Sequence, residues 1–235
     1  MKPCVIIPSF NGEKTIGVLV SKVKQRTIDV IVVDDGSLDL TSQRAALAGA
    51  TVLRNSNNRG KGVSLRKGFA YALGKGYEVI ITMDSDGQHL PEDIDKFLQA
   101  HTHNPEAAMV IGNRMHQPLH MPFERRIINR IMSQLISWIC HQRIPDSQNG
   151  FRLIKSNLLK ILALKCDKFE IESEIILEAA KWGVKIVSVE ITSVYENHPS
   201  LISPLVDTMR FIKFILPYVH FKNYWHKSFS VVSPS

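Results

Sequence analysis

Short apolar runs rich in β-branched residues alternate with longer segments of helical periodicity through the first half of the chain. The expected strands cover residues 4–7, 30–33, 50–53, 79–82 and 107–112. Each run is almost continuously apolar, which is typical of a strand that is buried on both faces of a sheet. The expected helices between them cover residues 13–25, 38–48, 60–75 and 91–103. This alternation predicts a single α/β domain with a Rossmann-like, doubly wound, mostly parallel sheet and flanking helices.

The second half of the chain is less regular. Residues 124–141 form an amphipathic pattern, and we expect its apolar stripe to face the core rather than lipid. That stripe consists of Ile127, Ile128, Ile131, Met132, Leu135, Trp138 and Ile139. A polar turn at 146–152 leads into a short strand, and the later segments predict two helices and a strand. These segments are 156–164, 172–182 and 185–191.

Polar residues follow the expected strands at the point where each one ends. They lie at 8–11, 34–37, 84–88 and 112–114, and three of these four segments carry carboxylates or a guanidinium. Ligands of doubly wound sheets bind outside the carboxyl ends of the strands. The sequence therefore predicts a ligand site at this edge.

The triplet Asp84-Ser85-Asp86 places two carboxylates directly after a buried strand. Residues two apart on an extended chain point to the same side, so both side chains can approach one hard divalent cation. The alternative is a set of capping acids ahead of a helix that begins near Pro91.

The glycine-rich segment 58–62 opens an expected helix. We expect its glycines to let the backbone approach a ligand, and the helix N-terminus favours anions. Asp34 and Asp35 are suited to ribose hydroxyls or a base edge, although an Asx turn is the structural alternative. The chain lacks a Walker loop, a dinucleotide-binding glycine motif, zinc-ligand spacing and a nucleophile elbow.

In this order, these motifs resemble those of family 2 glycosyltransferases of the GT-A fold. The closest subgroup is similar to dolichyl-phosphate mannose synthase and bacterial polyprenyl-phosphate sugar synthases. The resemblance extends from Val5 to about Ile191 and rests on seven segments. These are IIPSFNGEKTI (6–16), IVVDDGSLDLT (31–41), NRGKGVSLRKGF (58–69), TMDSDGQHLPEDI (82–94), IGNRM (111–115), DSQNGFRLI (146–154) and FEIESE (169–174).

The resemblance implies a role for each matching residue. The nucleotide would be cradled by Pro8, Phe10, Asp34, Asp35 and Lys61. Mg²⁺ or Mn²⁺ would be held by Asp84 and Asp86, with Gln88 beside them. Donor or acceptor phosphates would face Arg114 and Arg126. The acceptor-side motif would be Asp146, Gly150, Phe151 and Arg152, closed by Glu170 and Glu172. We expect catalysis to depend on Asp86, Arg114, Arg126, Asp146, Arg152 and Glu172.

The chain departs from the family pattern in two places. Where relatives often have Tyr-Asn-Glu, this chain reads Phe10-Asn11-Gly12. The nucleotide, UDP or GDP, therefore stays open. Many relatives also continue into transmembrane helices, whereas this chain ends at Ser235. Any membrane contact is thus expected to be peripheral or through a membrane-protein partner.

Charge and composition bear on partners and location. The net charge is +7, which suits anionic lipid, phosphorylated substrates or nucleic acid. We expect a catalytic domain at 1–200 and an amphipathic basic tail at 201–235, where four basic residues accompany one acid. The longest uncharged apolar stretch near the C-terminus, 214–221, is shorter than the roughly 20 residues of a spanning helix. The three cysteines are expected to be reduced. These features favour a cytoplasmic enzyme, with peripheral binding to the cytoplasmic face of a membrane as the alternative.

The leading hypothesis is an inverting glycosyltransferase that moves a sugar from a nucleotide sugar to a polyprenyl or dolichyl phosphate. A saccharide hydroxyl in a cell-envelope glycan is the alternative acceptor. Outside this class, a nucleotidyltransferase would release pyrophosphate instead of a nucleoside diphosphate. A non-catalytic binder of sugar nucleotides or nucleic acid is a third alternative, although we expect no nucleic-acid partner.

Overall fold

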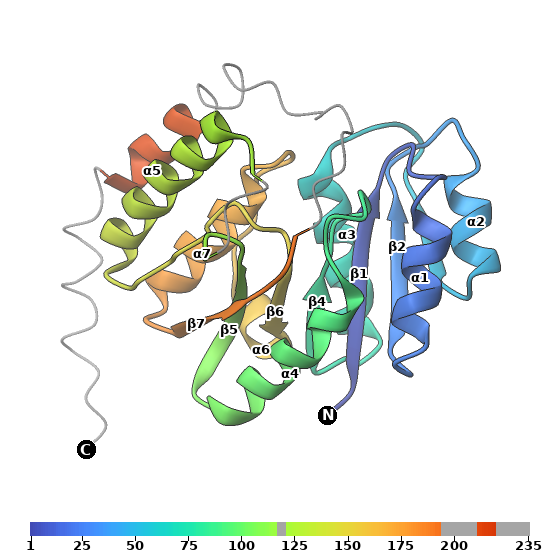
Figure 1. The fold of residues 1–235 in the computed structure, drawn as a ribbon, viewed down its shortest axis with the longest axis horizontal. Coiled ribbons are helices and arrows are strands. Elements are labelled where there is room, and N and C mark those ends of the chain that lie inside the picture. The colour runs from blue at the N-terminus through green and yellow to red at the C-terminus, as the bar shows by residue number, and fades with distance from the viewer. Residues whose placement is uncertain (117–120, 194–210, 220–235) are drawn as a thin grey trace.

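The computed structural model describes residues 1–116, 121–193 and 211–219. Seven strands form one sheet in the order β3-β2-β1-β4-β6-β5-β7. The strands are β1 (Pro3–Ser9), β2 (Asp29–Asp34), β3 (Thr51–Arg54), β4 (Val79–Thr82), β5 (Ala107–Asn113), β6 (Arg152–Lys155) and β7 (Lys185–Glu190). The helices are α1 (Ile16–Lys24), α2 (Thr41–Leu47), α3 (Lys61–Gly74), η1 (Pro91–Asp93), α4 (Ile94–His103), α5 (Phe123–Cys140), α6 (Ser156–Leu159) and α7 (Ile171–Lys181). Residues 211–219 form a further helix, shown in red in Figure 1.

The sheet is parallel except at β6, which pairs antiparallel with β4 and with β5. From β1 the chain builds β2 and β3 on one side and then crosses to β4 on the other. Such a reversal of direction is the topological switch point, where doubly wound sheets bind their ligands. Because β6 runs the opposite way, its first residue lies at the edge where the parallel strands end.

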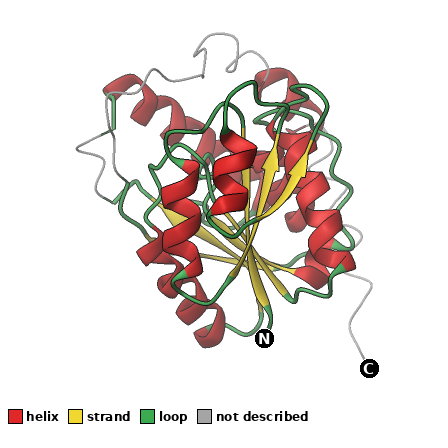
Figure 2. Cartoon of the chain, turned by 90° about the vertical axis from the view of Figure 1, so that its right-hand side faces the viewer, coloured by secondary structure: helices red, strands yellow, loops and turns green. Residues whose placement is uncertain are grey.

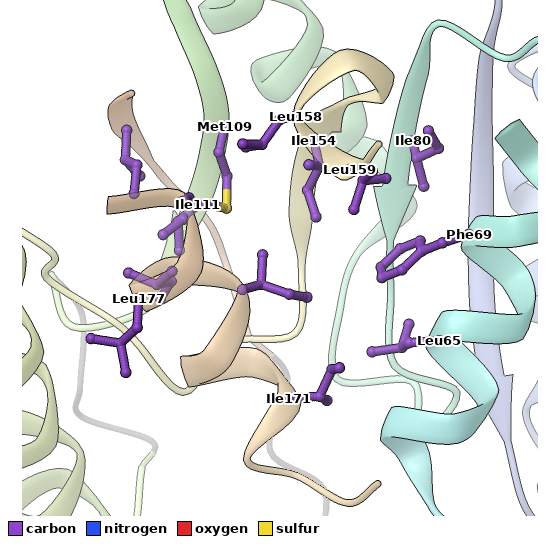
Figure 3. Packing of buried hydrophobic residues seen from close by; sticks show 14 of the residues in the cluster. Leu65, Phe69, Ile80, Met109, Ile111, Ile154, Leu158, Leu159, Ile171 and Leu177 are labelled. Carbon is purple, nitrogen blue, oxygen red and sulfur yellow. The ribbon is translucent and has the colours of Figure 1, made fainter. Parts of the chain in front are cut away.

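Helices cover both faces of the twisted sheet (Figure 2). One core cluster joins the sheet to α1, α2 and α4, and the other joins it to α3, α5, α6, α7 and residues 211–219. Alternate residues of β1 explain this: Val5 and Ile7 belong to the first cluster, and Cys4 and Ile6 to the second. In Figure 3, Leu65 and Phe69 extend from α3 into the cluster, with Ile80 of β4 on the Phe69 side and Ile171 of α7 on the Leu65 side.

Three expectations about burial and length were wrong. The run at 50–53 becomes β3, an edge strand whose residues are exposed or half-buried, not buried on both faces. The helix expected at 156–164 is only the single turn α6. The stripe on α5 is also divided. Met132 and Ile139 lie in the core, whereas Ile127, Ile131 and Trp138 are exposed.

The short helix 211–219 contacts the domain with one side. Phe211 and Ile215 are buried in the core, and the Tyr218 hydroxyl donates a 3.1 Å hydrogen bond to Glu178 of α7. The rest of the expected basic tail, including Leu205, Val206 and Met209, and the domain boundary at residue 200 lie outside the described residues. Among the helices in the described ranges, none has both the length and the apolar composition needed to cross a bilayer.

Candidate active site

The polar segments that follow the strands meet at one edge of the sheet, as the sequence predicted. β1 leads into Phe10, β2 ends at Asp34, and β4 is followed closely by Asp84. On the other side of β4, β5 leads into Arg114, and the reversed β6 begins at Arg152. The switch point between β1 and β4 lies at the centre of this edge.

Lys61, at the start of α3, joins two carboxylates from distant parts of the chain. Its Nζ donates hydrogen bonds to Asp84 Oδ1 and to Glu172 Oε1 at the start of α7. Gly150 makes this approach possible. A Cβ at that position would lie 2.7 Å from each Asp84 carboxylate oxygen and 2.8 Å from Glu172 Oε1.

These contacts fix the charges of the cluster. Burial opposes ionisation of Asp84, but Lys61, His89 and Arg114 outweigh it and hold the pKa of this carboxyl well below its usual value. Burial likewise opposes the Lys61 charge, yet Asp84 and Glu172 raise the pKa of its ammonium group. At neutral pH the cluster therefore contains an ionised Asp84 and a protonated Lys61.

The buried side chain of His89 accepts a hydrogen bond from the backbone of Asp84. Its ring is buried against Phe151, with a centroid separation of 5.1 Å. The Asp84 backbone N–H donates a 3.1 Å hydrogen bond to His89 Nδ1, so the proton of the neutral ring lies on Nε2. That atom lies 3.9 Å from Asp84 Oδ2. Burial lowers the pKa of His89, and Asp84 and Asp86 partly offset the effect.

Asp86 is exposed, and its Oδ1 accepts a 2.9 Å hydrogen bond from the Gln88 backbone N–H. Within the part of the chain that the structure describes, no three His, Cys, Asp or Glu side chains gather closely enough to form a metal site. Two carboxylates nevertheless suit Mg²⁺, which usually takes one or two from the protein and the rest of its oxygen ligands from water and substrate phosphates. The donor set of Asp84 and Asp86 therefore fits such an ion.

Asp34 and Asp35 lie where the sequence placed them, but their carboxylates contact protein groups. Asp34 is fully buried and accepts hydrogen bonds from the Ser37 N–H and the Ser42 hydroxyl. Asp35 Oδ2 accepts a 2.7 Å bond from the Gly60 N–H. In this structure the two acids hold the loops that follow β2 and β3, which is the supporting role of the Asx-turn alternative. A role in binding a nucleotide stays a prediction.

The glycines of segment 58–62 accommodate backbone, not the open approach to a ligand that we expected. A Cβ on Gly60 would lie 2.4 Å from the Asp167 carbonyl oxygen, and one on Gly62 would lie 2.2 Å from that of Cys166. The Asp167 carbonyl also accepts a 2.8 Å hydrogen bond from the Gly62 N–H. The first turn of α3 is thus partly capped by residues 166–167, and Lys61 is the group that it directs to the site.

Arg114 and Asp146 form a bidentate pair on the other side of β4. Arg114 Nε lies 2.8 Å from Asp146 Oδ2, and its second terminal nitrogen lies 3.0 Å from Oδ1. Asn129 of α5 donates a 2.9 Å hydrogen bond to the same Oδ1. Although burial opposes ionisation, these partners hold the pKa of the Asp146 carboxyl below its usual value. Asp146 therefore fixes the orientation of the Arg114 guanidinium.

Arg152 is 1% exposed, and its guanidinium donates to three backbone carbonyls. The acceptors are Asn149 at 2.7 Å, Ser147 at 2.8 Å, and Glu172. Arg152 thereby ties the 146–151 loop to the first turn of α7. In this arrangement its hydrogen bonds position the loop, and the catalytic part that we expected for it stays a prediction.

Three more predicted residues lie near this edge without joining the cluster. Pro8 is buried in β1, and Phe10 follows it half-buried. Arg126, near the start of α5, lies over the ring of Phe123 at 5.3 Å. Glu13, which follows the glycine that replaces the family's usual acid, accepts a 3.1 Å hydrogen bond from the Leu40 N–H and so joins two loops.

The sequence-based site left out several supporting residues. Asn129 and Ser133 lie four residues apart on the buried face of α5, and they bind Asp146 and Ser147 respectively. Two buried polar residues at helical spacing in an apolar helix were a detectable signal. Ser9 Oγ is buried at the end of β1 with no hydrogen-bond partner among the described residues, and no sequence pattern singled it out.

A family model described as "Glycosyl transferase family 2" matches residues 4–162, which span β1 to α6. The chain belongs to glycosyl transferase family 2. The residues of this glycosyltransferase that match the family model lie on both sides of the switch point and include Asp84 and Arg114. The enzyme class and the GT-A type of fold expected from the sequence are thereby confirmed.

Curated relatives match most of this glycosyltransferase. An uncharacterized protein of Methanocaldococcus jannaschii is 36% identical over 83% of this chain and 82% of its own length. The UDP-N-acetylglucosamine--dolichyl-phosphate N-acetylglucosaminyltransferase of Methanococcus voltae is 29% identical over 83% of this chain and 86% of its own. The undecaprenyl-phosphate mannosyltransferase of Micrococcus luteus is 28% identical over 83% and 84%.

Among solved structures, the fold resembles that of glucosyl-3-phosphoglycerate synthase from Mycobacterium tuberculosis, solved with Mn²⁺, UDP and glucosyl-3-phosphoglycerate. The TM-score is 0.70, with 16% identity, and the match covers 94% of this chain and 79% of the other. At that identity the likeness concerns the fold alone.

Proposed function

We propose that this glycosyltransferase moves a sugar from a nucleoside diphosphate sugar to a polyprenyl phosphate, with inversion at the anomeric carbon. One observation carries the proposal. Lys61 is hydrogen-bonded to Asp84 and Glu172, and Arg114, held by Asp146, follows β5 at the same edge of the sheet. Two cations suited to phosphate and a candidate metal ligand therefore lie at the edge that contains the switch point. Two relatives named for transfer to dolichyl and undecaprenyl phosphate support this acceptor class.

The donor is proposed to lie over β1 and β2. Pro8 and Phe10 would contact the nucleotide, while Asp34 and Asp35 hold the loops around it. The Lys61 ammonium group would face the diphosphate of the donor. Its hydrogen bonds to Asp84 and Glu172 fix its position. These loops do not decide between UDP and GDP, so the donor test includes both.

Asp84 and Asp86, with Gln88 beside them, would hold Mg²⁺ or Mn²⁺ together with the donor's phosphates. A bound divalent ion would supply neutralisation of the negative charge that develops on the departing nucleoside diphosphate. Arg114 and Lys61 add fixed positive charge at the same edge. Lys61 and Arg114 are already held in position by carboxylates, so binding of the ion and the donor would complete the charges needed for leaving-group departure.

The acceptor phosphate is proposed to need no general base. At neutral pH a phosphate monoester already carries about 1.5 to 2 negative charges, so positioning and desolvation are sufficient for attack. Arg114 and Arg126 would position it, since a guanidinium binds phosphate through two parallel hydrogen bonds. Asp146 and Glu172 are already bound to cations, which supports roles in orienting those cations. Attack from the face opposite the diphosphate would invert the configuration.

Because polyprenyl phosphates lie in membranes, we place the enzyme at the cytoplasmic face of a bilayer, where it would bind peripherally. We also propose residues 1–200 as the catalytic domain. A saccharide hydroxyl is the competing acceptor. It would need a carboxylate base within about 3 Å of the reacting oxygen, because its proton must leave during attack.

A panel of donors and acceptors tests the function. Purified enzyme is incubated with UDP- and GDP-linked sugars, Mg²⁺ or Mn²⁺, and either undecaprenyl phosphate or a free disaccharide, and products are identified by mass spectrometry. We expect a glycosyl phospholipid and no glycosylated disaccharide. Glu172→Gln and Asp146→Asn should retain measurable turnover, and Arg114→Ala should lose most of it. Abolition by either amide, with donor binding and folding intact, would replace the phosphate acceptor with a hydroxyl.

A further inference from the structure

Helix α5 presents large apolar side chains to solvent on the side opposite its buried residues. They recur at spacings of four, four and seven residues, which places them on one helical face. The exposed fractions are 65% for Phe123, 42% for Ile127, 59% for Ile131 and 53% for Trp138. Such a row is unusual on a water-facing helix and indicates an interaction surface.

The helix at 211–219, which is drawn beside α5 in Figure 1, carries two further exposed apolar side chains. Phe211 and Ile215 anchor it in the same core cluster as the buried side of α5, whereas Ile212 and Leu216 are 46% and 59% exposed. In Figure 1, α5 and this red segment lie at the end of the molecule far from α1 and α2. We call the six exposed side chains the docking face. They are Phe123, Ile127, Ile131, Trp138, Ile212 and Leu216.

Basic residues flank the docking face. Arg126 and Arg130 lie along one side of the α5 row, and Lys213 is exposed between the two residues that the second helix contributes. The one acid of α5 is Glu124. An apolar helical face with basic residues beside it suits the headgroup region of an anionic bilayer. A second copy of the chain suits it less well, because a symmetric contact would bring these cations against their own copies.

The opposite side of α5 reaches the acceptor-side motif. Asn129 binds Asp146, which holds Arg114, and Ser133 Oγ accepts a 2.9 Å hydrogen bond from the Ser147 N–H. A helix is about 10–12 Å across with its side chains, so a surface on the outer side lies about that far from these residues.

We propose that the docking face binds the surface of an anionic lipid bilayer and holds the acceptor-side motif beside it. The placement of the acceptor-side motif beside a lipid acceptor rests on the proposed function, whereas binding of the docking face to the bilayer does not depend on it. The apolar side chains enter the boundary between headgroups and acyl chains, and the basic residues bind anionic headgroups. Arg126 is shared, since it is also a candidate for the acceptor phosphate.

Co-sedimentation with vesicles tests the proposal. The docking-face variant is Ile127→Glu with Ile131→Glu, and the matched control is Val18→Glu with Leu47→Glu. The control positions are 62% and 89% exposed, lie on α1 and α2, and receive the same two charges. Each full-length protein is mixed with vesicles of phosphatidylcholine and phosphatidylglycerol in equal amounts, or of phosphatidylcholine alone. Melting temperatures within about 2 °C of wild type confirm folding.

Wild type and control should bind the anionic vesicles, and the docking-face variant should bind at least about tenfold more weakly, which equals about 1.4 kcal/mol. Arg130→Glu should weaken binding to a smaller extent, and raising the salt concentration should reduce the difference. Equal binding by the docking-face variant and the control would overturn the proposal. The proposal would also be overturned if wild type binds no vesicles and forms a dimer that the docking-face substitutions dissociate.

A second readout separates this proposal from the proposed function. With undecaprenyl phosphate in vesicles, transfer by the docking-face variant should fall about as much as its binding, whereas transfer in detergent micelles should stay near wild type. An equal loss in micelles would contradict the docking role. If wild type binds vesicles through this face but glycosylates no polyprenyl phosphate, the proposed acceptor fails and the docking face stands.

Discussion

Replacing Gly150 with alanine tests whether the cluster of Lys61, Asp84 and Glu172 must be closely packed. The added Cβ would lie 2.7 Å from both Asp84 carboxylate oxygens and 2.8 Å from Glu172 Oε1. To reach ordinary van der Waals contact at 3.4 Å, the Asp84 oxygens must retreat by about 0.7 Å and the Glu172 oxygen by about 0.6 Å. Because Asp84 is both a candidate metal ligand and a partner of Lys61, the displacement acts directly on the donor side of the site.

The expected costs differ for stability and for catalysis. Overpacking of this kind costs about 1–3 kcal/mol. For a domain of this size each kcal/mol lowers the melting temperature by about 2–4 °C, so the protein should still fold at 25 °C. Misplacement by about 1 Å can cost about 100-fold in rate. We therefore expect kcat/KM for Gly150→Ala to fall by about 30- to 100-fold.

Gly74→Ala is the matched control, because a Cβ there meets nothing within 4 Å. It lies at the last residue of α3, where alanine is the better helix former by up to about 1 kcal/mol. It should melt at or slightly above the wild-type temperature, with unchanged kinetics. Transfer is measured by release of nucleoside diphosphate at several donor concentrations, and folding by calorimetry. Wild-type kcat/KM for Gly150→Ala would refute the claim that this close packing matters.

Three further substitutions probe other parts of the site. Arg152→Met leaves three buried backbone carbonyls without their hydrogen-bond donor. At about 1 kcal/mol or more for each unsatisfied acceptor, it should lower the free energy of unfolding by at least about 3 kcal/mol. An unchanged urea midpoint with lost turnover would instead show a direct catalytic role. Asp146→Asn should destabilise the protein at pH 7. Because the folded pKa of Asp146 is depressed, its contribution is present above the unfolded value of about 3.9 and is lost as the pH falls through the folded value. The stability difference between Asp146→Asn and wild type should therefore shrink below about pH 4, and a difference that widens there would contradict this ionisation. Because Asp86 is exposed, the Asp86→Asn variant should melt within about 2 °C of wild type. It should nevertheless lose transfer activity in both Mg²⁺ and Mn²⁺. Normal turnover would show that Asp86 is not a metal ligand.

The sheet was predictable because its strands are short apolar runs separated by helical patterns. The carboxyl-edge rule then predicted that Asp84 and Arg114 lie at one edge of the sheet. The burial of the strands at the two edges of the sheet was harder to predict from the sequence. The residues of β3 look like those of a central strand, but only the strand order reveals that β3 has one neighbour.

Side-chain partnerships were the least predictable part of the site. The pairing of Lys61 with Glu172 joins residues 111 positions apart, and no local pattern encodes it. The resemblance assigned Arg152 to the acceptor-side motif, but no sequence pattern indicated its three backbone acceptors. For the glycines near Lys61 the sequence showed that something approaches closely, and only the fold identified it as the backbone of residues 166–167.

The central claim is that this glycosyltransferase makes a glycosyl polyprenyl phosphate with inverted configuration and releases a nucleoside diphosphate. Incubation of wild type with Mg²⁺, a nucleotide sugar accepted in the donor panel, and undecaprenyl phosphate, followed by NMR of the purified lipid, reports the linkage and the anomeric configuration together. An α-linked donor should give a β-linked glycosyl phosphate with one nucleoside diphosphate per product, and a chelator should abolish both. An α-linked product, release of pyrophosphate, or undiminished transfer in the chelator would contradict the account.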